Sequence, residues 1–425
     1  MFKTLRNAWS IPDLRKKMLY TLLMIFIFRL GSFIPVPGLN ASALKELVSQ
    51  DNSFFGLLDN FSGGSFSNAT IFAMGITPYI NSSIIMQLLT VAIPALERLS
   101  KEGEEGRKVI AKWTRVVTVV LALVQGIGMC FGIKGAVDPA NQDFTGYLTI
   151  VITFTAGTAF LMWLGEQITQ KGVGNGISII IFSGIVASIP SMGEKIYTLV
   201  KLEQLAWWGV ALIVAFIIAM IAFVVFITDA ERRVPVQYAK RMVGRKMYGG
   251  QSSHIPLKVA MAGVIPIIFA MSILSFPSTI MQFTGEPTSG FWATFWGFFK
   301  PTSWVYAVLY FLLIIFFTYF YTAIQFNPVE VANNMKKNGG FVPGIRPGKP
   351  TSDFISRILS KITLSGAFFL GVVAIIPVVA GIINPNLSVV TLGGTSMLIM
   401  VGVALETVKQ IESQMLMRHY KGFLD

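Results

Sequence analysis

Long apolar stretches alternate with polar connections along the whole chain. An apolar run of about 17–25 residues is long enough to cross the hydrocarbon core of a bilayer as a helix. The pattern predicts ten such segments, at residues 18–36, 76–93, 113–133, 147–165, 176–190, 207–227, 259–276, 304–324, 362–383 and 389–405. We therefore expect an all-α membrane protein with ten transmembrane helices.

The ten segments divide into two sets of five at about residue 190. If the two sets are related, an odd number of segments in each makes them inverted copies, as in many transporters. We therefore expect an N-terminal half over residues 1–190 and a C-terminal half over residues 191–425. The sequence contains no clear repeat, so ten helices packed without symmetry are the alternative.

The second apolar segment is unusually polar for a membrane helix and includes Asn81 and Gln87. Polar groups in hydrocarbon are unfavourable unless they are paired or hydrated, so this helix should face protein or water. Ile76, Ile80 and Ile84 recur at i, i+4 and i+8 and form one apolar stripe on it. The pattern fits a packed helix–helix seam and a water-lined path with an apolar constriction equally well.

Two glycine-rich stretches precede apolar helices. Residues 59–68 (DNFSGGSFSN) are too polar to cross a membrane and too apolar for an ordinary surface loop. Residues 171–176 (KGVGNG) lack the Lys-Ser/Thr ending and the strand–helix context of a phosphate-binding loop. We interpret the second stretch as a turn that leads into the fifth helix.

Charge sets the expected orientation. The chain is 53% hydrophobic yet carries a net charge of +13, and most of its 34 lysines and arginines lie in the tails and in alternate connections. Lysine and arginine mark the cytoplasmic side of membrane proteins, which predicts that both termini are cytoplasmic. The first segment lacks a small-residue cleavage pattern, so we expect it to be a permanent span and not a signal peptide.

The residues that carry most enzyme and transporter chemistry are sparse. Cys130 is the single cysteine, which excludes an intrachain disulfide, and both histidines fall outside the apolar segments. No acidic residue lies at the centre of a segment, although ion-coupled transporters usually hold one there. Arg29 is the one charge that looks buried within a segment, and the sequence assigns it no role. We expect no enzyme activity, catalytic residue, metal or cofactor.

Two long basic connections, residues 228–257 and 325–361, suggest docking surfaces. The first alternates like a β-hairpin, and the second frames Arg346 with prolines and glycines. Clustered cations bind phosphate groups, as in nucleic acid or anionic lipid, or an acidic protein face. Plain membrane topology is the alternative explanation, but it does not require such long connections. The candidate docking cations are Arg232, Arg233, Lys240, Arg241, Arg245, Lys246 and Arg346.

Several stretches spread over the whole chain resemble the SecY family, which forms the central channel of the bacterial protein translocase. They are residues 29–38 (RLGSFIPVPG), 61–64 (FSGG), 74–89 (MGITPYINSSIIMQLL), 162–181 (MWLGEQITQKGVGNGISIII), 238–241 (YAKR), 251–266 (QSSHIPLKVAMAGVIP), 326–347 and 393–399 (GGTSMLI). The resemblance implies an hourglass pore between two inverted five-helix halves, in the cytoplasmic (inner) membrane.

The resemblance also assigns site residues. The waist of the pore would be an apolar ring of Ile76, Ile80, Ile181, Ile268 and Ile399, with Ile177 as a further candidate. Residues 61–70 would be a plug, with Phe61, Ser62, Gly63, Gly64 and Ser65 at its start. Asn81 and Gln87 would lie at a lateral gate, where the second and third helices part from the seventh and eighth.

The function implied is a passive protein-conducting channel. It would translocate unfolded secretory polypeptides across the cytoplasmic membrane and insert membrane proteins after recognising their signal sequences. The implied partners are the SecE and SecG subunits, the SecA ATPase, the ribosome and anionic lipids. A small-solute secondary transporter is the alternative, but it needs a coupling-ion ligand that the sequence lacks. A scaffold without transport would not need the polar second helix.

Overall fold

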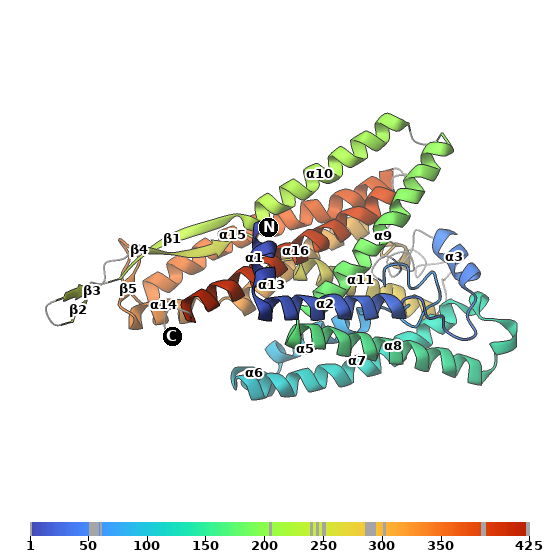
Figure 1. The fold of residues 1–425 in the computed structure, drawn as a ribbon, viewed down its shortest axis with the longest axis horizontal. Coiled ribbons are helices and arrows are strands. Elements are labelled where there is room, and N and C mark those ends of the chain that lie inside the picture. The colour runs from blue at the N-terminus through green and yellow to red at the C-terminus, as the bar shows by residue number, and fades with distance from the viewer. Residues whose placement is uncertain are drawn as a thin grey trace.

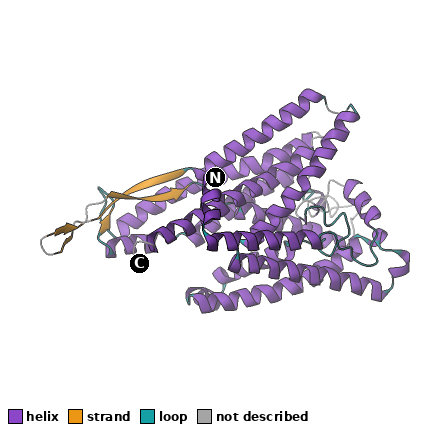
Figure 2. Ribbon diagram, in the orientation of Figure 1, coloured by secondary structure: helices purple, strands orange, loops and turns teal. Residues whose placement is uncertain are grey.

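The computed structural model describes residues 2–50, 59, 62–203, 206–238, 241–243, 246–248, 252–284, 295–300, 303–383 and 388–421. Helices form a bundle over most of this length, and a small β-unit projects from one end of it (Figure 1; Figure 2).

A helix is found at each of the ten expected apolar segments. These helices are α2 (Pro12–Gly31), α5 (Thr77–Ala92), α7 (Glu104–Gly132), α8 (Phe144–Lys171), α9 (Gly176–Lys201), α10 (Trp207–Asp229), α11 (Ile265–Thr284), α13 (Trp304–Gln325), α15 (Lys349–Ile383) and α16 (Ser388–Lys421). Shorter elements are α1 (Phe2–Ser10), α3 (Ala41–Gln50), α6 (Pro94–Lys101), α14 (Pro328–Lys337), η1 (Lys134–Ala136) and η2 (Pro139–Asn141).

Several of these helices fit a bilayer by length and composition, which is typical of a multi-pass membrane protein. Within the described residues, six helical stretches are long and apolar enough to cross, and α5 with α6 makes a seventh if that bent pair counts as one span. The pair bends by 102° where Ile93 precedes Pro94, because a residue before proline is driven into the extended region. The apolar part of α11 is shorter, at Ile265–Pro277.

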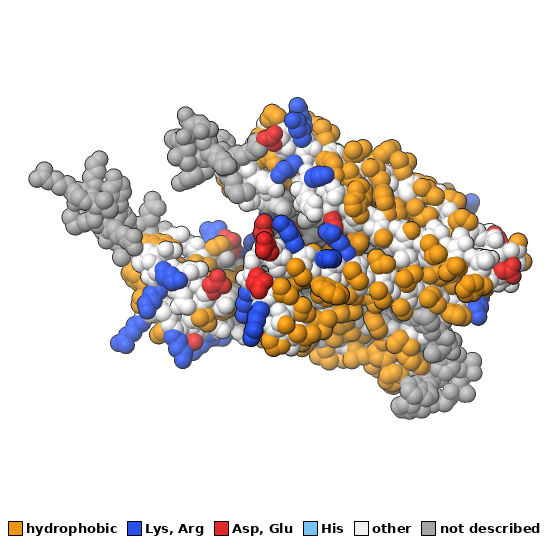
Figure 3. Space-filling model, turned by 90° about the horizontal axis from the view of Figure 1, so that it is seen from below, with side chains coloured by type: hydrophobic (Ala, Val, Ile, Leu, Met, Phe, Trp, Pro, Cys, Tyr) orange, Lys and Arg blue, Asp and Glu red, His pale blue; other side chains and the backbone are white. Residues whose placement is uncertain are grey.

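The surface divides along the length of the bundle. Figure 3 shows lysine and arginine side chains gathered toward the end that bears the β-unit, and apolar side chains covering much of the remaining face. The carboxyl-terminal part of α16 lies toward the charged end, whereas α3 lies at the opposite end of the bundle (Figure 1). This distribution matches the charge asymmetry of the sequence.

Three large clusters of buried apolar side chains form the core. One lies within the first 154 residues, and another lies almost wholly in α10, α11, α13, α15 and α16. The third, which we call the central cluster, takes side chains from both parts of the chain. Its buried members are Met24, Phe28, Phe72, Ile76, Leu161, Leu164, Ile168, Ile179, Ile180, Ile181, Ile185, Val264, Ile399 and Val403.

The β-unit confirms the hairpin expected in residues 228–257. Strands β1 (Glu231–Tyr238) and β4 (Ser252–Lys258) pair antiparallel with Val234 opposite Ile255. Strand β5 (Gly340–Phe341) joins the other edge of β1, giving the order β4-β1-β5. Strands β2 (Arg241–Val243) and β3 (Lys246–Tyr248) form a separate pair farther out. The two basic connections therefore share one sheet.

The turn expected before the fifth helix is also present. Asn175 caps α9, because its side-chain oxygen accepts hydrogen bonds from the backbone N–H groups of Ile177 and Ser178. The hydroxyl of Thr21 in α2 accepts a hydrogen bond from the backbone N–H of Val173. The glycine-rich turn thus connects helices and uses its polar groups in packing.

Candidate functional site

The central cluster brings together all five isoleucines expected to form a ring. Ile399 of α16 is fully buried, and Ile181 of α9 and Ile76 at the start of α5 are almost so. Ile80 of α5 and Ile268 of α11 are half-buried and pack against the same cluster. Ile177, the further candidate, packs there too.

This arrangement is apolar and comes from four separate helices. Side chains on α5, α9, α11 and α16 meet although they are up to about 320 residues apart in sequence. A constriction of this kind offers no specific polar contact and sheds water when it is empty. It can seal against ions and still yield to side chains of many shapes.

A buried segment of consecutive turns, residues 62–76, packs against the central cluster. Ser65 and Phe66 are fully buried, Ser62 is nearly so, and Phe72 belongs to the cluster. Phe61, the first expected plug residue, lies outside the described residues. Ser62, Gly63, Gly64 and Ser65 all lie in this turn segment.

The turn segment satisfies much of its own polarity, as irregular backbone inside a membrane protein must. Ser65 Oγ donates to the carbonyl of Ser62 over 2.7 Å, and Thr70 Oγ1 donates to that of Ser65 over 2.9 Å. The backbone N–H of Ser67 donates to Asp59 Oδ1 over 2.8 Å. The serines and the threonine replace the hydrogen bonds that a helix would have made.

Short extended pairings fix the far end of the turn segment to the connection that follows α2. The N–H of Val36 donates to the carbonyl of Ala69 over 2.8 Å, and the N–H of Ile71 donates to that of Ile34 over 3.0 Å. Ala69 takes a positive φ of 54°, which is uncommon for a residue with a Cβ. The turn segment is therefore held in a defined conformation.

Glycines on the surrounding helices let the turn segment approach closely. A Cβ on Gly157 of α8 would collide with the carbonyl of Ile71, and one on Gly31 of α2 would collide with the ring of Phe72. Such close approach needs a residue without a side chain. The turn segment thus fits into notches on neighbouring helices.

Arg29 reaches the turn segment from α2. Its Nη1 donates to the carbonyl of Gly63 over 3.5 Å, and its guanidinium lies 5.9 Å from the centre of the Phe33 ring. An arginine inside a membrane helix is tolerated when it faces the protein interior and pairs with backbone carbonyls. The one charge that the sequence left without a role therefore contacts the turn segment.

The two polar residues expected at a lateral gate lie on α5, where α11 packs against α5 and α7. Asn81 is 5% exposed, and its Oδ1 is buried without a hydrogen-bond partner in the described part of the chain, as is Oε1 of Gln87. By contrast, Ser82 Oγ on the same helix donates to the carbonyl of Thr114 in α7 over 2.7 Å. A buried oxygen without a hydrogen-bond partner is unfavourable, so this contact is less stable than a fully paired one.

The two basic connections form one structural unit with its own small core. Val234, Val236 and Leu257 of the hairpin pack with Met335, Val342 and Ile355. Sequence reasoning predicted two separate docking loops and missed their union, because β5 has only two residues and no alternating pattern to reveal it.

The expected docking cations have different positions in this unit. Arg232 and Arg233 are exposed on β1, and Arg233 pairs with Glu231 over 2.8 Å. Arg241 and Lys246 lie on β2 and β3, whereas Lys240 and Arg245 lie outside the described residues. Arg346 is exposed at a turn whose backbone accepts a hydrogen bond from Thr351 Oγ1 over 2.8 Å.

Known proteins resemble this chain along its whole length. The family model described as SecY matches residues 70–408. "Protein translocase subunit SecY" of Streptomyces scabiei is 48% identical over 446 residues and that of Halalkalibacterium halodurans is 48% identical over 435, and each match covers 100% of both chains. The protein of the same name from Aquifex aeolicus is 44% identical, again over 100% of both chains.

Solved structures show the same fold at low sequence identity. One described as "The structure of a protein conducting channel" has a TM-score of 0.67 at 18% identity and covers 94% of this chain and 92% of that one. Another, "Sec61 in the Canine ribosome-channel complex from the endoplasmic reticulum", has a TM-score of 0.63 at 16% identity, with the same coverage. The chain therefore belongs to the SecY family of protein translocase subunits.

Proposed function

We propose that this chain is the channel-forming subunit of a bacterial-type protein translocase, and not an enzyme. It conducts unfolded secretory polypeptides across the cytoplasmic membrane and releases hydrophobic segments sideways into the lipid. One observation carries the proposal: isoleucines from α5, α9, α11 and α16 converge in the central cluster, and the buried turn segment 62–76 packs against them.

In this proposal the ten long helices all cross the membrane as two inverted five-helix halves, residues 1–190 and 191–425. Both termini and the β-unit lie in the cytoplasm, as the lysine and arginine distribution supports. The five isoleucines form the waist of an hourglass pore, and residues 61–70 act as the plug. The solved structure described as "The plug domain of the SecY protein stablizes the closed state of the translocation channel and maintains a membrane seal" shares this fold, with a TM-score of 0.61.

The lateral gate in this proposal is the seam between α11 and the pair α5 and α7. A signal sequence enters there and offers hydrogen-bonding groups or apolar surface to a seam that contains the unpaired side-chain oxygens of Asn81 and Gln87. Because those oxygens lack partners in this conformation, separating the helices breaks no hydrogen bond to them.

The β-unit is the proposed landing site for partners on the cytoplasmic side. Exposed arginines there suit ribosomal RNA phosphates or an acidic protein face. We assign the ribosome and the SecA ATPase to this surface, and SecE and SecG to the outside of the bundle. Anionic lipids are assigned to the lysines and arginines at the end of the bundle that bears the β-unit (Figure 3). In this proposal the energy for movement comes from the docked partner.

The experiment is site-directed crosslinking to a stalled secretory chain in proteoliposomes that contain the assembled translocase. Ile80→Cys and Ile268→Cys should each form disulfides with a cysteine placed in the stalled chain. Ile273→Cys is the matched control, because Ile273 is on the same helix as Ile268 and is exposed on the surface of the bundle. Crosslinking at Ile273 alone, or at none of the three, would contradict the proposed pore.

A further inference from the structure

The β-hairpin is fixed to the bundle at both of its roots. Strand β1 begins directly after α10 ends at Asp229, and β4 ends at Lys258, seven residues before α11 begins. The backbone N–H of Val259 donates to the carbonyl of Ala230 over 3.0 Å and closes the base of the hairpin. Whatever moves the hairpin therefore acts on the start of α11.

Both roots lie close to charged side chains of α16. Lys409 Nζ lies 2.6 Å from Asp229 Oδ1, and the two residues are 180 positions apart in sequence. Lys258 at the other root lines one cavity together with Glu406 of α16, which carries the opposite charge. Glu406 and Lys409 are three residues apart, so they present opposite charges on the same face of α16.

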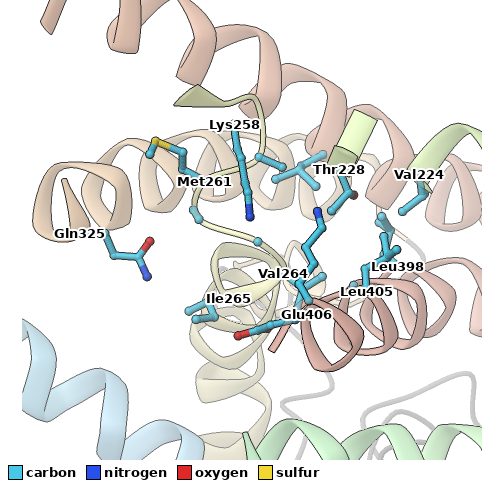
Figure 4. A pocket seen from close by; sticks show the side chains of 16 residues that line it. Val224, Thr228, Lys258, Met261, Val264, Ile265, Gln325, Leu398, Leu405 and Glu406 are labelled. Atoms are coloured by element: carbon cyan, nitrogen blue, oxygen red, sulfur yellow. The ribbon is translucent and has the colours of Figure 1, made fainter. Parts of the chain in front are cut away.

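Three of these charged side chains line a cavity of about 210 Å³ (Figure 4). Lys258, Glu406 and Lys409 lie there together with Gln325 at the end of α13 and Thr228 at the end of α10. The rest of the lining comes from apolar residues of α10, α15 and α16 and from residues 260–265. The space lets the charged groups shift without a clash, so the roots can move relative to α16 while they stay attached.

The connection from β4 to α11 rests in notches on two helices. A Cβ on Gly402 of α16 would collide with Val264, and one on Gly366 of α15 would collide with the carbonyl of Val259. Gly263 takes a positive φ of 60° just before α11 begins. A displacement of the hairpin is thus transmitted to α11 and to α16 by direct contact.

The same face of α16 continues to the ring. Glu406 follows Ile399 by seven residues, which is about two helical turns, so the two side chains lie on one side of the helix. Ile268 lies one turn into α11. The two helices that the hairpin roots contact, α11 and α16, therefore carry two of the five proposed ring residues.

We propose that Asp229, Lys258, Glu406 and Lys409 are positioning residues that couple partner docking on the hairpin to opening of the ring. They fix the hairpin roots to α16, so that force on the hairpin moves α11 and α16 relative to α5 and α9. The inference rests on the proposed channel function.

The test uses the assembled translocase in proteoliposomes, with SecA and a non-hydrolysable ATP analogue as the docking partner. Ring opening is read as the fall in the rate of disulfide formation between Ile80→Cys and Ile268→Cys when SecA binds, and SecA affinity is measured separately. We expect Asp229→Lys and Lys409→Glu each to bind SecA within about twofold of the parent. In these variants SecA should slow disulfide formation much less than it does in the parent. The double variant restores the pair with reversed charges, and SecA should again slow disulfide formation in it as in the parent.

The matched control is the reversal of Glu97 and Lys101 on α6, a pair with the same 2.6 Å separation that lies away from the hairpin. It should leave docking and opening at parental values. Binding of SecA within about twofold of the parent shows that the single variants are folded. Parental opening in both single variants, or no recovery in the double, overturns the coupling while the channel proposal stands. Failure of the parent to respond to SecA overturns both.

Discussion

Gly63 of the turn segment lies directly against the backbone of Gly184 in α9. A Cβ on Gly63 would be 2.8 Å from the carbonyl oxygen of Gly184 and 2.9 Å from its Cα. Real Cβ atoms do not come this close to backbone, which cannot move aside as a flexible side chain can. The turn segment therefore packs this closely against α9 only because residue 63 is glycine.

Gly63→Ala should weaken the packing of the turn segment against α9 and increase ion leakage through the resting channel. The added methyl group meets the α9 backbone, and overpacking of this kind typically costs about 1–3 kcal/mol. We expect resting chloride flux through proteoliposomes containing the assembled translocase to rise several-fold. The same assay applied to a chain lacking residues 62–67 sets the upper limit of the effect.

Gly64→Ala is the matched control for the backbone. Gly64 also has a positive φ, 82° against 65° for Gly63, so an alanine at either position meets left-handed strain of roughly 1–2 kcal/mol. A Cβ on Gly64, however, would contact only the end of the Asn68 side chain at 3.8 Å. Equal flux through the two variants would show that strain, and not the contact with Gly184, controls the seal.

Truncation at the ring should affect stability and sealing together. Ile399 is fully buried in the central cluster, so Ile399→Ala should lower the free energy of unfolding by about 2–5 kcal/mol. It should also raise resting ion flux, because a wider constriction holds water more readily. Thermal unfolding of the purified complex and the flux assay measure the two effects.

Ile376→Ala makes the comparison specific, because Ile376 is 37% exposed on α15. This variant should lose about 1 kcal/mol or less and keep the resting flux of the parent. The idea of a sealing ring would be wrong if Ile399→Ala destabilised the protein as expected and left the flux unchanged.

The long helices were predictable because an apolar run of bilayer length is a strong local pattern. The polar ends of α15 and α16 were not, since residues such as Lys349 and Arg418 give no apolar run although the helices include them. The hairpin was visible from its alternation, but its pairing with Gly340 and Phe341 depends on tertiary contact between distant residues.

The candidate site was predictable in a different way. The apolar stripe on α5 and the odd composition of residues 59–68 were visible in the sequence, and the family resemblance supplied the other ring positions. No local pattern could reveal that Arg29 reaches the carbonyl of Gly63 or that Gly184 receives the turn segment. Both depend on how α2 and α9 pack around it.

The native thiol provides a direct test of packing in the N-terminal half. Cys130 is 5% exposed on α7, so it should resist N-ethylmaleimide in native membranes and react only after denaturation. A cysteine in place of Phe144, which is 81% exposed at the start of α8, should react within minutes. Similar labelling rates at the two positions would contradict the burial of Cys130 and would complicate cysteine crosslinking in the unmodified background.

Arg346 should matter for docking and not for folding. Its turn is shaped by the backbone: Ile345 N–H donates to the carbonyl of Val342 over 3.0 Å, and Gly344 and Gly348 take positive φ values. The Arg346 side chain itself is exposed. Arg346→Glu should therefore leave the amount of inserted channel unchanged.

Motor-driven export by Arg346→Glu should fall about tenfold or more, since reversing a charge at a docking contact costs on the order of 1.4 kcal/mol or more. Export of a secretory protein into membrane vesicles, with SecA affinity measured alongside, provides the readout. Lys112→Glu reverses a positive charge at another exposed position, near the start of α7, and should export at the parental rate. Equal losses in the two variants would mean that net charge alone attracts the motor. A loss confined to Arg346 would identify the turn at the tip of the second basic connection as the contact, because the backbone there holds a defined turn that presents the cation.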